Sequence, residues 1–267
     1  MSLTGFFDLG KMDELGRMDT PAHRIDARAK VLVTAVFICV VMSFPRHEIS
    51  SLAPFLVYPV ALTSLGRIPL RYIGRKMIIA APFALIIGIF NPIVDRQPVA
   101  AIGPFVITSG WVSFASIMLR FVLTVGAALS LLACTGMNRL GAAMQRLGVP
   151  RVFVVQILFL YRYLFVISDH AVRMKRSADI RSAGRPLRFR VYGSMIGHLL
   201  LRAMDRAERV HRAMVARGFN GEMRVLHPPA FRWSDAAFVV VCLLLFVSAR
   251  VWNLADALGR LLVEVAP

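Results

Sequence analysis

The stretch WVSFASIMLRFVLTVGAALSLLACT, residues 111–135, decides the fold class of this chain. It is apolar along almost its whole length, and Arg120 is its only charged residue. A helix needs about 20 predominantly apolar residues to cross the hydrocarbon core of a bilayer. The stretch therefore predicts a transmembrane helix, and it indicates that the chain is an integral membrane protein.

The rest of the sequence supports this class, because 57% of its 267 residues are hydrophobic. A soluble domain of this length is usually less apolar. Further apolar runs occupy residues 31–44, 51–65, 77–94 and 236–252. Together with residues 111–135 they predict an all-α integral membrane protein with about five transmembrane helices.

The charge is strongly basic, since 32 Lys and Arg residues outnumber 15 Asp and Glu residues and give a net charge of +17. Such a charge can indicate nucleic-acid binding, but no nucleic-acid-binding motif is present. The arginines instead lie beside the apolar runs, which is typical of cytoplasmic loops in membrane proteins. This rule predicts the inner (cytoplasmic) membrane, with a cytoplasmic N-terminus and cytoplasmic segments at 66–76, 136–151 and 171–232.

A sixth apolar run, residues 152–167, lies between two of these cytoplasmic segments. A run that starts and ends on the same side of the membrane cannot cross it once. We therefore expect it to dip into the membrane or lie along the inner leaflet, and Arg162 near its middle agrees with this. Five helices then cross, and the C-terminus lies outside.

Two long helices are predicted over residues 155–181 and 187–217, separated by a Gly-Arg-Pro break typical of a helix end followed by a helix start. Each has a seam of apolar or small residues in steps of three and four, and charged residues such as Arg202, Arg206 and Arg209 lie on the other faces. The seam of the first helix is Leu164, Ile167, Ala171, Met174 and Ala178; that of the second is Ile196, Leu200, Ala203, Ala207, Val210 and Met214.

Both seams end at an arginine followed by small residues, Arg181 in the first helix and Arg217 in the second. A single cation at a helix C-terminus is explained by the helix dipole. Two matched ends favour a docking role, because a guanidinium on a narrow tip can enter a groove of a partner and donate to carboxylates or carbonyls there. We divide the chain into a tail with four membrane helices (1–135), a coupling domain (136–230) and a C-terminal membrane helix (231–267).

Three segments resemble the transmembrane T component of energy-coupling-factor (ECF) transporters. They are TPAHRIDARAKVL at 20–32, GAAMQRLGVPRVF at 141–153 and RAERVHRAMVARGFNG at 206–221, so the likeness runs over most of the chain. The last segment, with the His-Pro-Pro after it, is most similar to the cobalt-type, CbiQ-like members.

The resemblance implies that Arg217, flanked by Ala216 and Gly218, is one of two ATPase-docking arginines. Its counterpart reads Ile180-Arg181-Ser182 and departs from the Ala-Arg-Gly pattern. The resemblance also implies a non-catalytic subunit of an ATP-driven importer. Two partner subunits would bind ATP and Mg, and a separate membrane subunit would capture the cargo, which is cobalt or, alternatively, nickel or a vitamin.

The sequence offers little chemistry of its own. Its six histidines form no i,i+3 or i,i+4 pair, no phosphate-binding loop is present, and no metal site or cofactor is predicted for the chain. A membrane enzyme with a basic cytoplasmic active site would need convergent acids and histidines, and a self-sufficient permease is less favoured because several helices are short or broken. Arg120 is either a contact to an acid of a partner subunit or an internally hydrogen-bonded arginine.

Overall fold

The computed structural model describes residues 16, 18, 20–45, 50–94, 98–102, 105–183, 185–221 and 231–251. They divide into two compact units. The apolar unit contains residues 16–136 and 231–251, and the arginine-rich unit contains residues 137–221. The predicted domain limits, at 135/136 and 230/231, lie next to the points where the chain passes between the units. The C-terminal helix, however, belongs to the same unit as the first four membrane segments.

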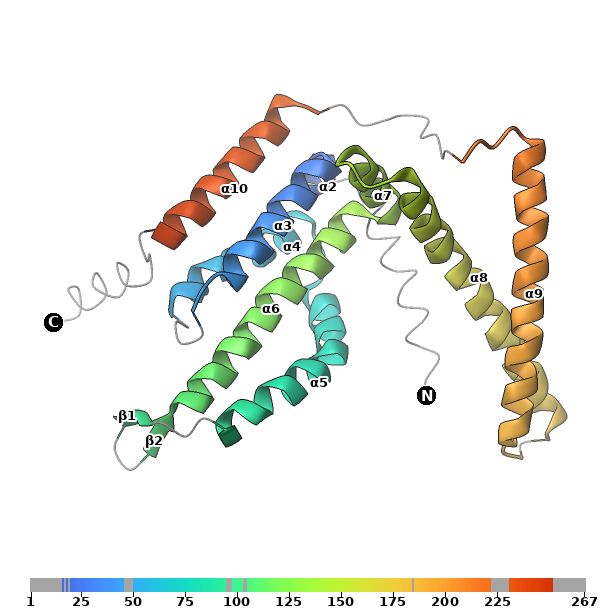
Figure 1. The fold of residues 1–267 in the computed structure, drawn as a ribbon, viewed down its shortest axis with the longest axis horizontal. Coiled ribbons are helices and arrows are strands. Elements are labelled where there is room, and N and C mark those ends of the chain that lie inside the picture. Colours follow the sequence, from blue (N-terminus) through green and yellow to red (C-terminus); the bar gives the residue numbers. More distant parts are fainter. Residues whose placement is uncertain are drawn as a thin grey trace. The chain divides into compact units, whose positions relative to one another are not determined.

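Helix α6 is the centre of the apolar unit and packs against α3, α4 and α5, while α10 packs along α3 (Figure 1). A short 3₁₀ helix, η1, leads into α4 and also contacts α10. The elements are α2 (Pro21–Arg24), α3 (Ala27–Met42), η1 (Ser50–Leu56), α4 (Val57–Leu65), α5 (Leu70–Val94), α6 (Ser109–Thr135) and α10 (Trp233–Val251).

Aromatic side chains hold these segments together. The ring of Phe37 on α3 lies 4.8 Å from Tyr58 on α4 and 5.4 Å from Phe246 on α10. Phe55 of η1 completes the cluster, 6.1 Å from Phe37. Pro54 lies inside η1, where a proline disfavours a regular α-helix, so the second apolar run begins with a 3₁₀ helix before α4.

Within the described residues, four helices are long and apolar enough to cross a membrane: Leu70–Pro92, Ser109–Thr135, Arg151–Arg181 and Trp233–Arg250. A shorter apolar helix covers Ser51–Leu65. The prediction of an all-α membrane protein is confirmed. The four long helices are not the same segments as the five predicted transmembrane helices. Helix α3, in the first predicted segment, has only 16 residues, whereas the run at 152–167 belongs to a helix of 31 residues. That residues 152–167 do not cross stays a prediction.

A β-hairpin lies between the third and fourth predicted membrane helices. Strand β1 (Pro98–Ile102) pairs antiparallel with β2 (Phe105–Thr108), with Ile102 opposite Phe105. This hairpin was not predicted, although valine, isoleucine and phenylalanine favour strands. Because β2 ends directly before Ser109, the hairpin leads into the first turn of α6.

The arginine-rich unit consists of α7 (Met137–Arg146), α8 (Arg151–Arg181) and α9 (Phe189–Ala216). Helix α7 packs on α8, and α8 and α9 run in opposite directions (Figure 1). Gly141 permits the close approach of α7, since a Cβ there would lie 3.0 Å from the Leu158 side chain. The turn after α7 contains Gly148, whose φ of 101° lets the Val149 N–H donate back to the Met144 carbonyl at 3.1 Å.

Candidate functional site

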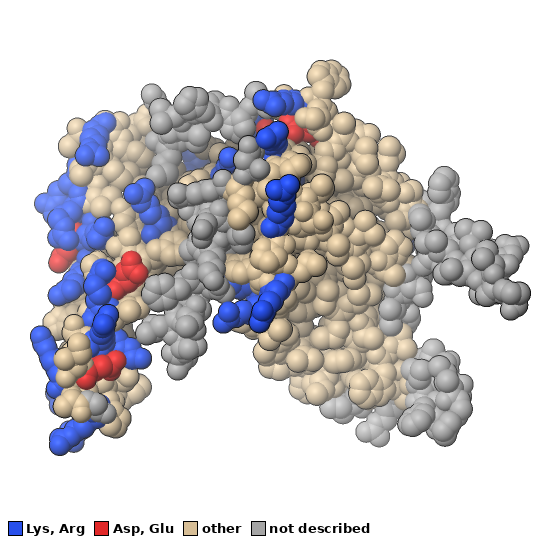
Figure 2. All heavy atoms as spheres, turned by 180° about the vertical axis from the view of Figure 1, so that it is seen from behind, with Lys and Arg blue, Asp and Glu red and all other residues tan. Residues whose placement is uncertain are grey.

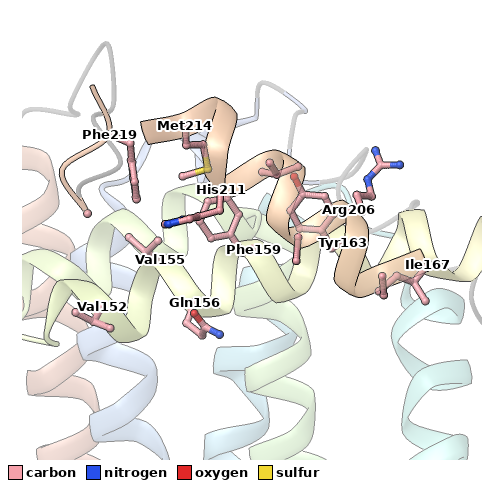
Figure 3. Close-up of a pocket in the computed structure, with 14 residues that line it drawn as sticks. Val152, Val155, Gln156, Phe159, Tyr163, Ile167, Arg206, His211, Met214 and Phe219 are labelled. Atoms are coloured by element: carbon pink, nitrogen blue, oxygen red, sulfur yellow. The ribbon is translucent and has the colours of Figure 1, made fainter. Parts of the chain in front are cut away.

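A groove of about 520 Å³ lies between the first half of α8 and the second half of α9 (Figure 3). Its walls are mainly apolar and aromatic, and three side chains with polar groups, Gln156, Arg206 and His211, also line it. The apolar lining is Val152, Val155, Phe159, Tyr163 and Ile167 from α8, and Ala203, Ala207, Val210 and Met214 from α9, with Phe219 after it.

The face of α9 that is half-buried only partly matches the predicted seam. Ile196 and Leu200 are 67% and 61% exposed, whereas their neighbours Met195 and Leu199 are half-buried. The half-buried positions are Met195, Leu199, Ala203, Arg206, Val210 and Met214. Most of these steps are four residues, which is the row used by helices that cross at an angle rather than supercoil.

The predicted seam of α8 fits more closely. Ile167, Ala171, Met174 and Ala178 are half-buried, and Leu164 is 37% exposed. Of these, Ile167 lines the groove (Figure 3). The small side chains at Ala171 and Ala178 leave room for a neighbouring helix.

The predicted position of Arg206 on the outer face of the second long helix is wrong. Arg206 was placed on the outer charged face, but it is half-buried and lines the groove with its guanidinium 5.9 Å from the centre of the Tyr163 ring. This geometry is a cation–π contact. The residue lies three positions after Ala203 and four before Val210, and this spacing places it on the packing face. His211 also lines the groove and was not predicted to do so (Figure 3).

The end of α9 has a defined backbone geometry. Gly218 has a φ of 78°, its N–H donates to the Val215 carbonyl at 2.9 Å, and the Phe219 N–H donates to the Met214 carbonyl at 3.0 Å. These two bonds form a Schellman motif, in which a hydrophobic residue after the glycine commonly packs back on the helix. Phe219 and Met214 both line the groove and show this arrangement (Figure 3). Phe219 was not predicted to line the groove, although its position directly after the glycine is typical of the hydrophobic residue in this motif.

Arg217 is the C-cap residue of α9, with φ −95° and ψ 12°, and it is exposed together with Ala216 and Gly218. Arg217 therefore lies at the C-terminal end of the helix as an exposed cation. A Cβ added at Gly218 would meet no atom within 4 Å. Within this chain the glycine is therefore required by its backbone conformation and not by crowding.

The end of α8 is built differently. Arg181 is the last helical residue, Ser182 is the C-cap, and Ala183 takes the left-handed conformation with a φ of 49°. The Ser182 hydroxyl donates to the Asp179 carbonyl at 2.8 Å, and Ile180 is 73% exposed. Arg181 therefore stands one residue farther from the left-handed position than Arg217 does. Both arginines are exposed, but the two helix ends do not present them on the same backbone frame.

Positive charge gathers over α8 and α9, as the space-filling view shows (Figure 2). An ion pair on this surface, between Arg212 and Glu208 at 2.9 Å, joins two exposed side chains one helical turn apart. Such a pair contributes only a few tenths of a kcal/mol. The surface around the helix ends thus remains strongly basic and suits an acidic or carbonyl-rich partner.

Arg120 has partners inside the apolar unit. One terminal nitrogen of its guanidinium donates to the Phe44 carbonyl at 3.0 Å and to the Pro45 carbonyl at 2.7 Å. The guanidinium of Arg250 lies 4.4 Å from the centre of the Phe44 ring. Both cations therefore meet the C-terminal end of α3, where carbonyls lack helical partners and positive charge is favourable. This arrangement supports the internally hydrogen-bonded reading of Arg120.

Fold and site together define a multi-pass helical membrane protein that carries two long, arginine-tipped helices. The sequence profile of the family described as "Cobalt transport protein", CbiQ, matches residues 18–227, and the chain belongs to this family. The chain is therefore the membrane component of a transporter, in agreement with the resemblance seen in its sequence.

Three relatives illustrate the family. The ECF transporter transmembrane protein EcfT of Heliobacterium modesticaldum is 26% identical over 259 residues, covering 89% of this chain and 95% of the relative. The cobalt transport protein CbiQ of Rhodobacter capsulatus is 28% identical over 205 residues, covering 74% and 80%. An uncharacterized protein of Methanocaldococcus jannaschii is 26% identical over 234 residues, covering 84% and 80%.

Proposed function

We propose that this chain is the coupling and scaffold subunit, the T component, of an ECF-type importer. It would link two cytoplasmic ATPase subunits to a substrate-binding membrane subunit and catalyse no reaction itself. The names of its relatives support this role. The observation that carries the proposal is the exposed Arg217 at the Schellman end of α9, a single guanidinium on a narrow, basic tip.

In this proposal Arg217 docks into a groove of one ATPase subunit, with Ala216 and Gly218 keeping the tip slim. Arg181 is the corresponding residue for the other ATPase subunit. Because Ile180 is large and exposed and Ser182 is the C-cap, its contact must differ from that of Arg217. ATP and Mg belong to the ATPase subunits, and the chain needs no cofactor of its own.

The groove between α8 and α9 supports a mechanical role. Its apolar walls and the Arg206–Tyr163 contact join the helices, and the crossing leaves an open space of about 520 Å³ between them. Closure of the ATPase subunits would move the arginine tips, and the crossed helices would tilt or spread in response. This movement would change the contacts of the two helices with the substrate-binding subunit. Such a difference in contacts between two states is what allows one subunit to shift the conformation of another.

Cobalt is the cargo that we propose, because the matching family and one relative carry this name. The substrate-binding subunit, and not this chain, would hold the ion. Among the residues described, no three His, Cys, Asp or Glu side chains lie together in a way that could hold a metal. The proposed location is the cytoplasmic membrane, with the N-terminus, α8 and α9 on the cytoplasmic side.

Reconstitution tests the proposal as a whole. The tagged chain would be purified together with its candidate ATPase and substrate-binding subunits, placed in liposomes, and assayed for ATP-dependent uptake of Co²⁺ and, in parallel, Ni²⁺. We expect a stable complex that accumulates Co²⁺ only with hydrolysable ATP. Transport by the chain alone would contradict the scaffold role, and uptake of Ni²⁺ in place of Co²⁺ would contradict the cargo.

A further inference from the structure

The short segment Thr20–Lys30 at the start of the apolar unit buries an unusual set of polar side chains. Thr20, His23, Asp26 and Lys30 are between 1% and 5% exposed. Burial of charged groups is costly unless they are hydrogen-bonded, so such groups are seldom retained without a role. The resemblance to a family signature at these residues assigns them no role.

Lys30 binds the chain close to the point where it leaves the apolar unit. Its ammonium donates to the carbonyls of Ala22 and Cys134, each at 3.0 Å. Cys134 lies in the last turn of α6, where a cation offsets the helix dipole and satisfies a carbonyl that has no helical partner. The helix ends at Gly136, and the arginine-rich unit begins with the next residue.

Asp235 binds the chain close to the start of α10, after the chain has returned to the apolar unit. It lies in the first turn of α10 and is 2% exposed. One carboxylate oxygen accepts the Asp26 N–H at 2.9 Å, and the other accepts the Arg232 N–H at 2.8 Å. The Asp26 carboxylate in turn accepts the Arg28 N–H at 2.8 Å and caps α3. The start of α10 is thereby tied to the start of α3.

The end of α6, where the chain enters the arginine-rich unit, and the start of α10 are thus both held by one segment of eleven residues. We propose that Lys30 and Asp235 are positioning residues that anchor these two helix ends. Coupling between distant sites is carried by rigid, contiguous elements. With the end of α6 and the start of α10 held in place, a movement of α8 and α9 is transmitted to α6 and α10 and is not absorbed by flexible connections. This inference rests on the proposed coupling function. It adds that the segment Thr20–Lys30 is the part of the apolar unit through which the movement is transmitted.

Two variants test the anchors one at a time in the complete transporter. Lys30→Met keeps the length of the side chain but removes the ammonium, and Asp235→Asn removes the negative charge and one acceptor. Arg24→Met, at an exposed position in the same segment, is the matched control. For each variant one would measure retention of the ATPase subunits, the rate of ATP hydrolysis, and cargo uptake per ATP hydrolysed.

We expect both anchor variants to keep the ATPase subunits and to hydrolyse ATP, while uptake per ATP falls about tenfold, within the usual range of coupling between sites. The control should keep its uptake ratio. A direct readout accompanies this: the thiol of Cys134, which is 0% exposed, should react faster with a maleimide in Lys30→Met when Cys39 and Cys242 are replaced by serine.

Assembled variants with an unchanged uptake ratio and unchanged Cys134 reactivity would overturn the anchor proposal. If the ATPase subunits never associate with the unmodified chain, the proposed function fails instead, and the two failures are therefore distinguishable. Should Lys30→Met fail to fold, Asp235→Asn still tests the proposal, because its amide oxygen retains one of the two acceptors.

Discussion

Arg120, near the middle of α6, donates a hydrogen bond of 3.0 Å to the carbonyl of Phe44 at the C-terminal end of α3. The two residues meet because α3 is short. Its 16 residues span about 24 Å at 1.5 Å per residue, less than the roughly 30 Å of a hydrocarbon core. The carbonyls of Phe44 and Pro45, just after the end of α3, would otherwise lack donors in apolar surroundings, and an arginine from the neighbouring helix supplies one.

This relationship predicts that Arg120→Met destabilises the protein by about 1.5–3 kcal/mol, the range for a hydrogen bond to a charged group. Arg120→Lys should lose less, because an ammonium can still reach one carbonyl. Thermal unfolding of the purified chain in detergent measures both. If Arg120 instead serves a partner subunit, Arg120→Met would leave the isolated chain as stable as before and weaken only the complex.

The Schellman end of α9 predicts a backbone effect without a packing effect. Gly218→Ala adds a Cβ into open space but at a φ of 78°, so we expect destabilisation of the helix end by about 1–2 kcal/mol. Ala183→Gly at the end of α8 is the mirror experiment, because Ala183 already has a φ of 49° and should gain stability. Hydrogen exchange at the amides of the two helix ends measures both effects: protection should fall in Gly218→Ala and rise in Ala183→Gly. Equal protection in Gly218→Ala and the parent chain would contradict the assignment.

The aromatic cluster predicts where truncation is most costly. Phe37 is 0% exposed and contacts rings from η1, α4 and α10, so Phe37→Ala should destabilise the apolar unit by about 3–5 kcal/mol. Phe83→Ala is the control, since that ring is 73% exposed on α5. Denaturation in detergent compares the two. A loss for Phe83 as large as that for Phe37 would show that the cluster is not the core.

The predicted topology can be read from a single thiol. His170→Cys, in a background without the native cysteines, lies in the middle of α8, and we expect an impermeant maleimide to label it only from the cytoplasmic side. Arg96→Cys, in a segment predicted to be external, should show the opposite labelling. Periplasmic labelling at position 170 would contradict five crossings and would make the apolar half of α8 a transmembrane segment.

Local features of the fold could be predicted from the sequence, whereas features that depend on distant partners could not. The long helices predicted at 155–181 and 187–217 appear as Arg151–Arg181 and Phe189–Ala216, because apolar periodicity and the Gly-Arg-Pro break are local signals. The contact of Lys30 with Cys134 joins positions far apart in the chain, and no spacing rule indicates it.

Errors at the site have the same origin. A seam drawn in steps of three and four assumes a supercoil, and the crossing of α8 and α9 instead brings Met195, Leu199 and Arg206 to the packing face. The charge of Arg206 suggested solvent, but the Tyr163 ring provides a place for the cation inside the groove. The exposed ends at Arg181 and Arg217 needed no tertiary information, since each lies at a helix terminus.

The most direct test of the coupling account is retention of the ATPase subunits by a tagged chain carrying Arg217→Glu. Arg209→Glu is the matched control, because it makes the same charge reversal at an exposed position on the same helix, two turns before the tip. The account predicts that Arg217→Glu loses at least one ATPase subunit and ATP-dependent uptake, while Arg209→Glu keeps both. Full retention and uptake with Arg217→Glu would contradict it.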